Sequence, residues 1–274
     1  MTTTPDQNEN QGRKELSSAE SSAIGKDWKK YLFEFLLIFM AVFLGFLADS
    51  FRENYGEQQQ AIELARSFYE ELKNDSATVV SKIDGRHQKE KSIKYMIEFF
   101  RDSSLTSKSK ELPYHFIWGV TARSPIIFTP RTVVLAQLKS SGSLRYFKND
   151  RLQKQIGDLS VAIDFIVARQ EYENSIFTTY MEPVMINHMD FDFQHKLWQN
   201  SVSIFDRLEE YRISDEYIPF YISQPDRINR QTLMNSLGYY HTNGLLSTRL
   251  IAFQKYAAVN TELLKELRVE YGIK

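Results

Sequence analysis

The side chains best suited to acid–base or metal chemistry gather in the segment NHMDFDFQH. Two histidines and two aspartates lie there at close spacing: His188, Asp190, Asp192 and His195. In an extended segment the first three of these side chains point to one face, and together they suit a divalent metal. The alternating Met189, Phe191 and Phe193 equally fit a half-buried strand. One hypothesis is therefore a metal-dependent hydrolytic enzyme that uses these four residues.

The rest of the sequence offers no comparable chemistry. The other histidines, His87, His115 and His241, are scattered, and no Gly-x-Ser-x-Gly, His-Glu-x-x-His or Gly-rich phosphate loop is present. The chain has no cysteine, which excludes disulfides, thiolate catalysis and Cys-ligated zinc. Its 34 basic and 35 acidic residues give a net charge of -1, so no basic field gathers nucleic acid. We expect no cofactor, no nucleic-acid partner and no catalytic residue.

Two other groups of residues have both a structural and a functional interpretation. The run Ser140-Ser141-Gly142 fits a helix end in which Gly142 is left-handed and Leu144 packs back over it. Alternatively, its hydroxyls and backbone N–H groups hold an anion near Lys139 and Arg145. Tyrosine and phenylalanine concentrate around 211–221 and 239–241, where they fit core packing or a ligand or partner groove.

The clearest signal for an element is the apolar run LFEFLLIFMAVFLGFLA at residues 32–48, in a chain whose mean hydropathy is only -0.41. Its leucine, isoleucine, phenylalanine and valine side chains, at about -0.3 to -0.6 kcal/mol each, outweigh the single carboxylate Glu34 near the edge. We therefore predict a transmembrane helix at 28–51, with Trp28, Tyr31 and Phe51 at the interfaces. A buried core helix and a cleaved signal peptide are the alternatives.

The flanking charges predict the orientation of this anchor. Lys26, Lys29 and Lys30 precede it, whereas Arg52 on the other side is accompanied by Glu53 and Glu57. By the positive-inside rule, the N-terminus is cytoplasmic and the C-terminal bulk lies outside. Within the anchor we expect Glu34 to snorkel or to meet Lys30, and Ala41 and Gly45 form a small-x-x-x-small pair that allows two helices to approach closely.

The remaining sequence predicts an all-α protein. Apolar residues recur at helical, heptad-like spacing over 58–100, 152–180 and 226–271, and a short helix is expected at about 202–211. Arg86 and Glu90 interrupt the first stripe beside Asp84-Gly85, which indicates a kink or break near residue 85, and Asn149-Asp150 suit an N-cap. We expect a loop at 103–112, irregular structure at 113–131, a long connection at 184–225 and a bend near Gly238 or Gly244.

These expectations give three parts: a disordered cytoplasmic tail at 1–27, the transmembrane helix at 28–51 and an extracytoplasmic helical domain at 52–274. The domain is expected to be an antiparallel bundle of long amphipathic helices.

Two passages resemble an uncharacterised family of single-pass membrane proteins that is frequent in Bacteroidota. They are FEFLLIFMAVFLGFLADSFREN, from Phe33 to Asn54, and TVVLAQLKSSGSLRYFKNDRLQKQI, from Thr132 to Ile156. Matching features are the acidic Glu34, the exit at 52–54, the Lys139–Gly142 run with Leu144, and the cap at 149–152. Ser50-Phe51 departs from the Asn-Trp pair usual in the family. The resemblance implies a bacterial inner-membrane location, a periplasmic C-terminal domain and a helical fold, and supplies no catalytic residues.

The leading hypothesis is a non-catalytic protein that is held in the lipid bilayer and presents an interaction or sensing module outside the cytoplasm. Its expected partner is another protein or a second copy of the chain. A further alternative is an auxiliary subunit of a membrane complex.

Overall fold

The computed structural model describes residues 9–105, 109–199 and 202–273, with side chains from Trp28 onward. The chain divides into two units, Met1–Gln60 and Ala61–Lys274, and each is described by itself. The described residues form helices and irregular connections and contain no strand, which confirms the predicted all-α class.

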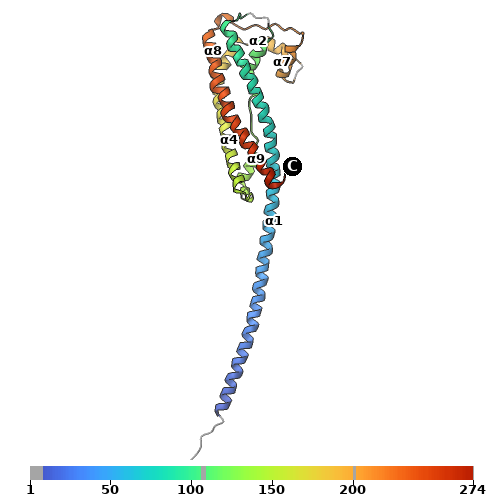
Figure 1. Cartoon of the computed structure of the whole chain (residues 1–274), viewed down its shortest axis with the longest axis vertical. Coiled ribbons are helices and arrows are strands. Elements are labelled where there is room, and N and C mark those ends of the chain that lie inside the picture. The colour runs from blue at the N-terminus through green and yellow to red at the C-terminus, as the bar shows by residue number, and fades with distance from the viewer. Residues whose placement is uncertain (1–8, 106–108, 200–201, 274) are drawn as a thin grey trace, which may run out of the picture. The chain divides into compact units, whose positions relative to one another are not determined.

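The first unit contains the beginning of helix α1 (Glu9–Asp102) (Figure 1). The helix starts inside the segment for which a disordered tail was expected, and residues 1–8 of that segment lie outside the described residues. From residue 28, α1 holds a stretch long and apolar enough to cross a membrane, with a mean hydropathy of 2.3 over 18 residues. None of this stretch is buried against other parts of the protein.

Large apolar side chains cover the whole circumference of this stretch. Phe35, Phe39 and Phe43 lie one helical turn apart, with ring centroids 6.3 and 6.1 Å from one another along the helix. Leu36, Ile38 and their neighbours on the other faces are equally exposed. A helix that is apolar all round and unburied within its own fold suits a lipid environment.

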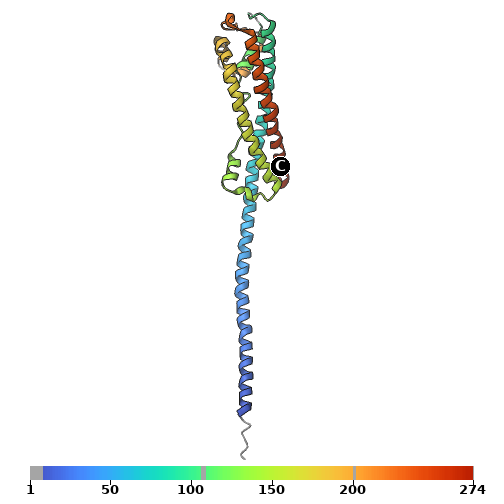
Figure 2. The ribbon, with the colours of Figure 1, turned by 90° about the vertical axis from the view of Figure 1, so that its left-hand side faces the viewer.

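The second unit consists of the remainder of α1 and shorter helices, several of them π-helical. After α1 come α2 (Glu111–Phe116), η1 (Ile117–Thr121), α3 (Val133–Ser140), η2 (Ser143–Tyr146), α4 (Asp150–Ile176), η3 (Phe177–Met181), α5 (Glu182–His188), α6 (Phe191–Trp198), α7 (Ile204–Ile213), η4 (Pro225–Arg227), α8 (Arg230–Tyr239), η5 (Tyr240–Leu246), η6 (Thr248–Phe253) and α9 (Gln254–Tyr271). In both views the later part of α1, α4 and α9 lie side by side (Figures 1 and 2).

Two apolar cores hold this unit together. The first core gathers the α1 side chains from Ala61 to Val79 with α3, the first half of α4, and α9. The second core gathers α1 from Ile93 to Phe100 with α2, η1, η3 and the elements from α5 to η5. The part of α1 between Val79 and Ile93 therefore joins two separate cores.

Several predicted helices are confirmed, together with their caps. Asn149 caps α4, its side-chain oxygen accepting hydrogen bonds from the backbone N–H groups of Arg151 and Leu152 at 3.0 and 3.2 Å. Helix α7 is the short helix expected at 202–211. Gly142 adopts the expected left-handed conformation, with φ of 68°, and Leu144 packs against the first core.

Other expectations are wrong. Residues 113–121, expected to be irregular, are helical because Pro113 lies in the first turn of α2, where its missing N–H is not needed. Pro183 lies directly after the π-helical η3, and the helical structure continues through it into α5, beyond the predicted end of the second stripe. Besides the expected short helix, the connection at 184–225 contains most of α5 and all of α6, which were not expected. The bend expected near Gly238 or Gly244 stays a prediction, and the backbone there is helical and passes from α8 into the π-helical η5.

The helix break expected near residue 85 does not occur. Helix α1 continues through Gly85 without interruption. A Cβ atom on Gly85 would lie 2.5 Å from the carbonyl oxygen of Pro125. Glycine is therefore needed here because the 122–132 segment crosses close to the helix, and its presence does not mark a helix end.

Candidate functional site

A layer of buried charged residues separates the two cores. Its members are Arg86, Lys89 and Glu90 on α1, Glu173 on α4 and Arg249 on η6, and all five are at least nine-tenths buried. We call these five residues the polar layer. Three π-helical segments lie close to these residues in the sequence. Segment η3 follows Glu173, η5 precedes Arg249 and η6 contains Arg249. Such segments insert an extra residue per turn and are frequent at functional sites.

Arg86 is the centre of the polar layer. Its Nη1 lies 2.7 Å from Oε2 of Glu173, and its Nε donates to the backbone oxygen of Ile126 at 3.1 Å. The guanidinium carbon lies 4.1 Å from the centre of the Phe253 ring. The hydroxyl of Tyr240 donates to the other carboxylate oxygen of Glu173 at 3.3 Å, and burial raises the pKa of this tyrosine well above its usual value. Glu173 therefore accepts hydrogen bonds at both oxygens.

Lys89 is buried completely and has no carboxylate in hydrogen-bonding contact among the described residues. Its Nζ donates to the backbone oxygen of Ala122 at 2.7 Å and lies 5.5 and 5.4 Å from the ring centres of Phe177 and Tyr240. Burial lowers the pKa of Lys89 to about 7, and the nearby Glu173 only partly opposes this effect. The amine can therefore change its charge near neutral pH.

Glu90 and Arg249 form a second buried ion pair in the layer. Nε and Nη2 of Arg249 donate to the two carboxylate oxygens at 2.6 and 2.9 Å, a fork that fixes both groups. Nearby, burial lowers the pKa of His241, whose Nε2 is buried without a hydrogen-bond partner in the described part of the chain.

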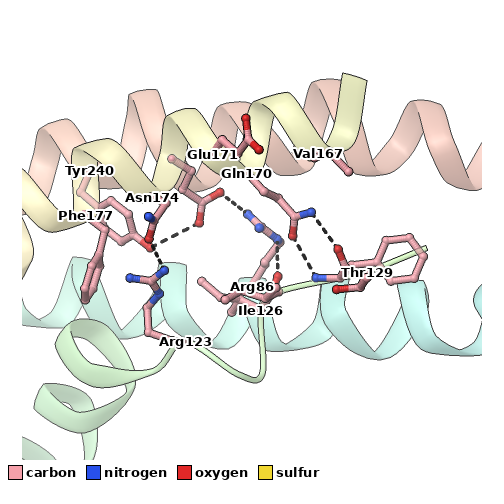
Figure 3. A pocket seen from close by; sticks show the side chains of 13 residues that line it. Arg86, Arg123, Ile126, Thr129, Val167, Gln170, Glu171, Asn174, Phe177 and Tyr240 are labelled. Carbon is pink, nitrogen blue, oxygen red and sulfur yellow. Dashed lines mark hydrogen bonds and ion pairs between the residues drawn. The ribbon is translucent and has the colours of Figure 1, made fainter. Parts of the chain in front are cut away.

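A cleft of about 380 Å³ opens beside the Arg86–Glu173 pair. Figure 3 shows its side chains coming from α1, from the 122–132 segment, from α4 and from η5. The apolar part of its lining consists of Ile126, Ile127, Phe128, Val167 and Phe177. Its volume falls within the range of small-molecule sites, roughly 300–1,000 Å³.

The cleft walls are held by specific contacts between the 122–132 segment and α4. The side-chain amide of Gln170 pairs with the backbone of Phe128, donating to its oxygen at 2.8 Å and accepting from its nitrogen at 2.9 Å (Figure 3). Arg123 donates through Nη2 to Asn174, and its guanidinium carbon lies 4.2 Å from the centre of the Phe177 ring. The cleft combines fixed cationic groups with an apolar wall.

The four residues predicted as metal ligands do not form a metal site. No group of three or more His, Cys, Asp or Glu side chains within the described part of the chain lies close enough to hold a metal ion. The segment is not extended: α5 ends at His188 and α6 begins at Phe191. Asp190 caps α6 by accepting from the N–H of Phe193 at 2.9 Å, and it also accepts from the N–H of Tyr221.

The other members of that segment have local partners or lie at the surface. Nδ1 of His188 lies 2.9 Å from the backbone oxygen of Ser223, Asp192 pairs with Lys196 at 2.5 Å, and His195 is exposed. The prediction of a half-buried strand is wrong. Asp190 caps α6, and the phenylalanine and aspartate residues after it belong to an amphipathic helix.

The anchor residues Glu34, Ala41 and Gly45 all lie in the exposed apolar stretch of α1. The described residues contain no ion pair between Glu34 and Lys30, and close approach of two helices at Ala41 and Gly45 stays a prediction. At the anion site predicted for Ser140-Ser141-Gly142, the Ser141 hydroxyl donates to the backbone oxygen of Gln137 at 2.6 Å, and Lys139 donates to Ser160. These groups are engaged in local structure.

Sequence reasoning noticed part of the polar layer and missed the rest. Arg86 and Glu90 interrupt the apolar stripe of α1, a pattern that also fits a helix break. Gln170 and Glu173 continue the three-four spacing of Leu159, Ile163 and Ile166 on α4. The sequence thus places polar residues at core-facing positions in both α1 and α4. This pattern is the feature from which a buried polar layer could have been predicted.

No family model, curated protein or solved structure matches the chain.

Proposed function

We propose that this chain is a single-pass, non-catalytic protein of the bacterial inner membrane that presents a periplasmic helical module for interaction or sensing. The observation that carries the proposal is the apolar stretch of α1, which is wholly unburied and is followed by a folded unit with its own cores. Proposed membership of the uncharacterised Bacteroidota family rests on the residues quoted above and is consistent with this arrangement.

The proposed orientation places the N-terminus in the cytoplasm, on the strength of Lys26, Lys29 and Lys30. The second unit is then outside. An antiparallel pairing of α4 with α9 is supported by contacts at both ends: Asn149, which caps α4, donates to Glu270 near the end of α9 at 3.0 Å, whereas Arg169 late in α4 donates to Ser247 ahead of α9.

The buried polar layer supports a role in binding or sensing over a purely structural one. Buried ion pairs are often no more stable than apolar replacements, so a protein that needed only a rigid spacer would have no use for the three cations and two carboxylates of the polar layer. Because α1 supplies both the apolar stretch and three residues of the layer, one helix connects the anchor to this site along the chain.

A reporter that is active only outside the cytoplasm, fused after Lys274, tests the proposal. We expect activity from the full chain. A matched reporter fused after Gly25, ahead of the anchor, should be inactive. An inactive fusion after Lys274 with stable expression would overturn the orientation and the periplasmic module.

An auxiliary role in a membrane complex is the second candidate. Purification in mild detergent separates the two: a stoichiometric membrane partner at native expression supports the auxiliary role, and a free protein or homo-oligomer supports a sensor.

A further inference from the structure

We propose that the cleft beside Arg86 and Arg123 binds a small organic carboxylate that has an apolar body. The inference deepens the proposed sensing role and rests on it for its biological meaning. The ligand's carboxylate would meet the two guanidinium groups, and its apolar body would lie against the isoleucine and phenylalanine wall (Figure 3).

The first argument is the hydrogen-bonding state of Arg86. The residue is 1% exposed and lines the cleft, yet only Nε and Nη1 donate to described residues. Nη2 has no partner among them. Nη2 is not among the atoms that are buried without a partner, so it is open to the cleft, where the carboxylate of a ligand can replace water as its acceptor.

The second argument is the same feature in Arg123. Its guanidinium is half-buried and stacked on Phe177, and within the described chain its hydrogen bond goes to the neutral amide of Asn174. No carboxylate pairs with it there. The stacked ring holds the guanidinium in place, so Nε and Nη1 remain available in a fixed orientation, which suits the planar geometry of a carboxylate.

The third argument is the balance of charge. Glu173 is the one buried carboxylate that faces the cleft, and it already accepts from Arg86 and Tyr240. The cleft therefore has a cationic excess even when Lys89 behind it is neutral. Glu171 also lines the cleft but is exposed, so water screens its charge. One excess positive charge matches a monoanion better than a phosphate dianion.

The fourth argument is the apolar wall. Ile127 and Val167 are 41% and 40% exposed, which is unusual for such side chains on the walls of a cleft, and Phe128 and Ile126 lie beneath them. An apolar ligand body would cover this surface. Inorganic anions leave it uncovered, so the wall favours an organic acid.

The test is calorimetric titration of the full chain in phosphatidylcholine nanodiscs, with empty nanodiscs as the blank. The probes are 2-naphthoate and its neutral counterpart 2-naphthamide, which have nearly the same shape. We expect 2-naphthoate to bind at least about tenfold more tightly, because its carboxylate forms ion pairs through two oxygens, whereas the neutral amide offers one carbonyl oxygen. Equal affinity for the two probes, or no binding of 2-naphthoate, would overturn the proposal.

Two variants locate the binding. Arg123→Gln should weaken 2-naphthoate binding by about tenfold or more and leave 2-naphthamide unchanged. Val167→Trp fills the cleft and should abolish binding of both probes. Its matched control is Val161→Trp, an exposed position on the same helix outside the cleft, which should bind like the original chain. Wild-type affinity in Val167→Trp would place the probe elsewhere and refute the proposed site.

This experiment is independent of topology. An active reporter after Lys274 with no binding of 2-naphthoate refutes only the ligand. Tight, Arg123-dependent binding with an inactive reporter refutes the periplasmic module and leaves the ligand class standing.

Discussion

At the scale of single residues, the unusual feature of this protein is the number of charges at core positions. Arg86, Lys89, Glu90, Glu173 and Arg249 occupy places between two apolar cores where leucine or isoleucine would otherwise pack. Removing one partner of a buried pair leaves an uncompensated charge, whereas removing both leaves an apolar contact. The polar layer therefore leads to two predictions about the free energy of unfolding. One concerns the removal of one or both partners of a pair, and the other concerns pH.

The Arg86–Glu173 pair predicts a non-additive effect on stability. Glu173→Leu should lower the free energy of unfolding by about 3–5 kcal/mol, since it leaves Arg86 buried without a carboxylate. Adding Arg86→Met should restore a large part of this loss. Chemical denaturation measures both, with Glu171→Leu, an exposed neighbour, expected within about 0.5 kcal/mol of the original chain. Additive losses, in which Arg86→Met costs as much in the Glu173→Leu background as in the original chain, would show that the pairing is unimportant.

Lys89 predicts how stability depends on pH. Burial lowers its pKa from 10.5 to about 7 in the folded protein, so between these values the unfolded chain binds the extra proton. Stability should therefore rise with pH in this window, by up to about 1.4 kcal/mol per pH unit, and Lys89 should contribute no slope below it.

The measurement is the free energy of unfolding at several pH values from about 7.5 to 8.5, where only a few per cent of each unfolded tyrosine is ionised. Lys89→Met should remove most of the rise, whereas Lys91→Met, an exposed neighbour on α1, should keep it. The same slope in both variants would assign the pH dependence to other groups.

The residue scale is also where sequence reasoning stopped short. The NHMDFDFQH segment looked like chemistry because acids and imidazoles are close in sequence, but a helix boundary at Met189 separates them and makes Asp190 a cap. The real cluster joins residues from three distant segments. Pairings such as Arg86 with Glu173 depend on tertiary packing, which no single stripe specifies.

At the scale of elements, the sequence predicted helices from local rules and failed where packing overrides them. Asn149 and Gly142 were recognised because capping and left-handed conformations depend on neighbouring residues alone. The π-helical segments could not be recognised, since the extra residue in each turn fits the packing around the polar layer and has no local signature. Gly85 was misinterpreted for a similar reason.

Two glycines in helices predict opposite results on replacement. Gly85→Ala should destabilise the protein by about 1–3 kcal/mol, because its Cβ would meet the Pro125 oxygen. Gly157→Ala on α4 has open space around the new Cβ and should stabilise by about 0.5–1 kcal/mol through helix propensity. Thermal or chemical unfolding compares them. A stabilising Gly85→Ala would mean that the 122–132 segment does not approach α1 as described.

At the scale of the whole molecule, the proposed membrane location depends on the apolar stretch of α1. Its composition and its exposure agree: the side chains from Leu32 to Leu47 that would bury in a soluble protein have no protein surface covering them. The apolar helical stretch was predictable from sequence because hydrophobicity and helical propensity are local properties. The cleft was not, because its walls come from four separate segments.

The most direct test of the central claim uses the absence of cysteine in this chain. Single cysteines at Ser22, before the anchor, and at the exposed Ser140, after it, are treated in intact spheroplasts with a membrane-impermeant maleimide. The account predicts that Ser140→Cys is labelled at once and that Ser22→Cys is labelled only after the membrane is permeabilised. Labelling of Ser22→Cys with protection of Ser140→Cys, or labelling of both before permeabilisation, would contradict it.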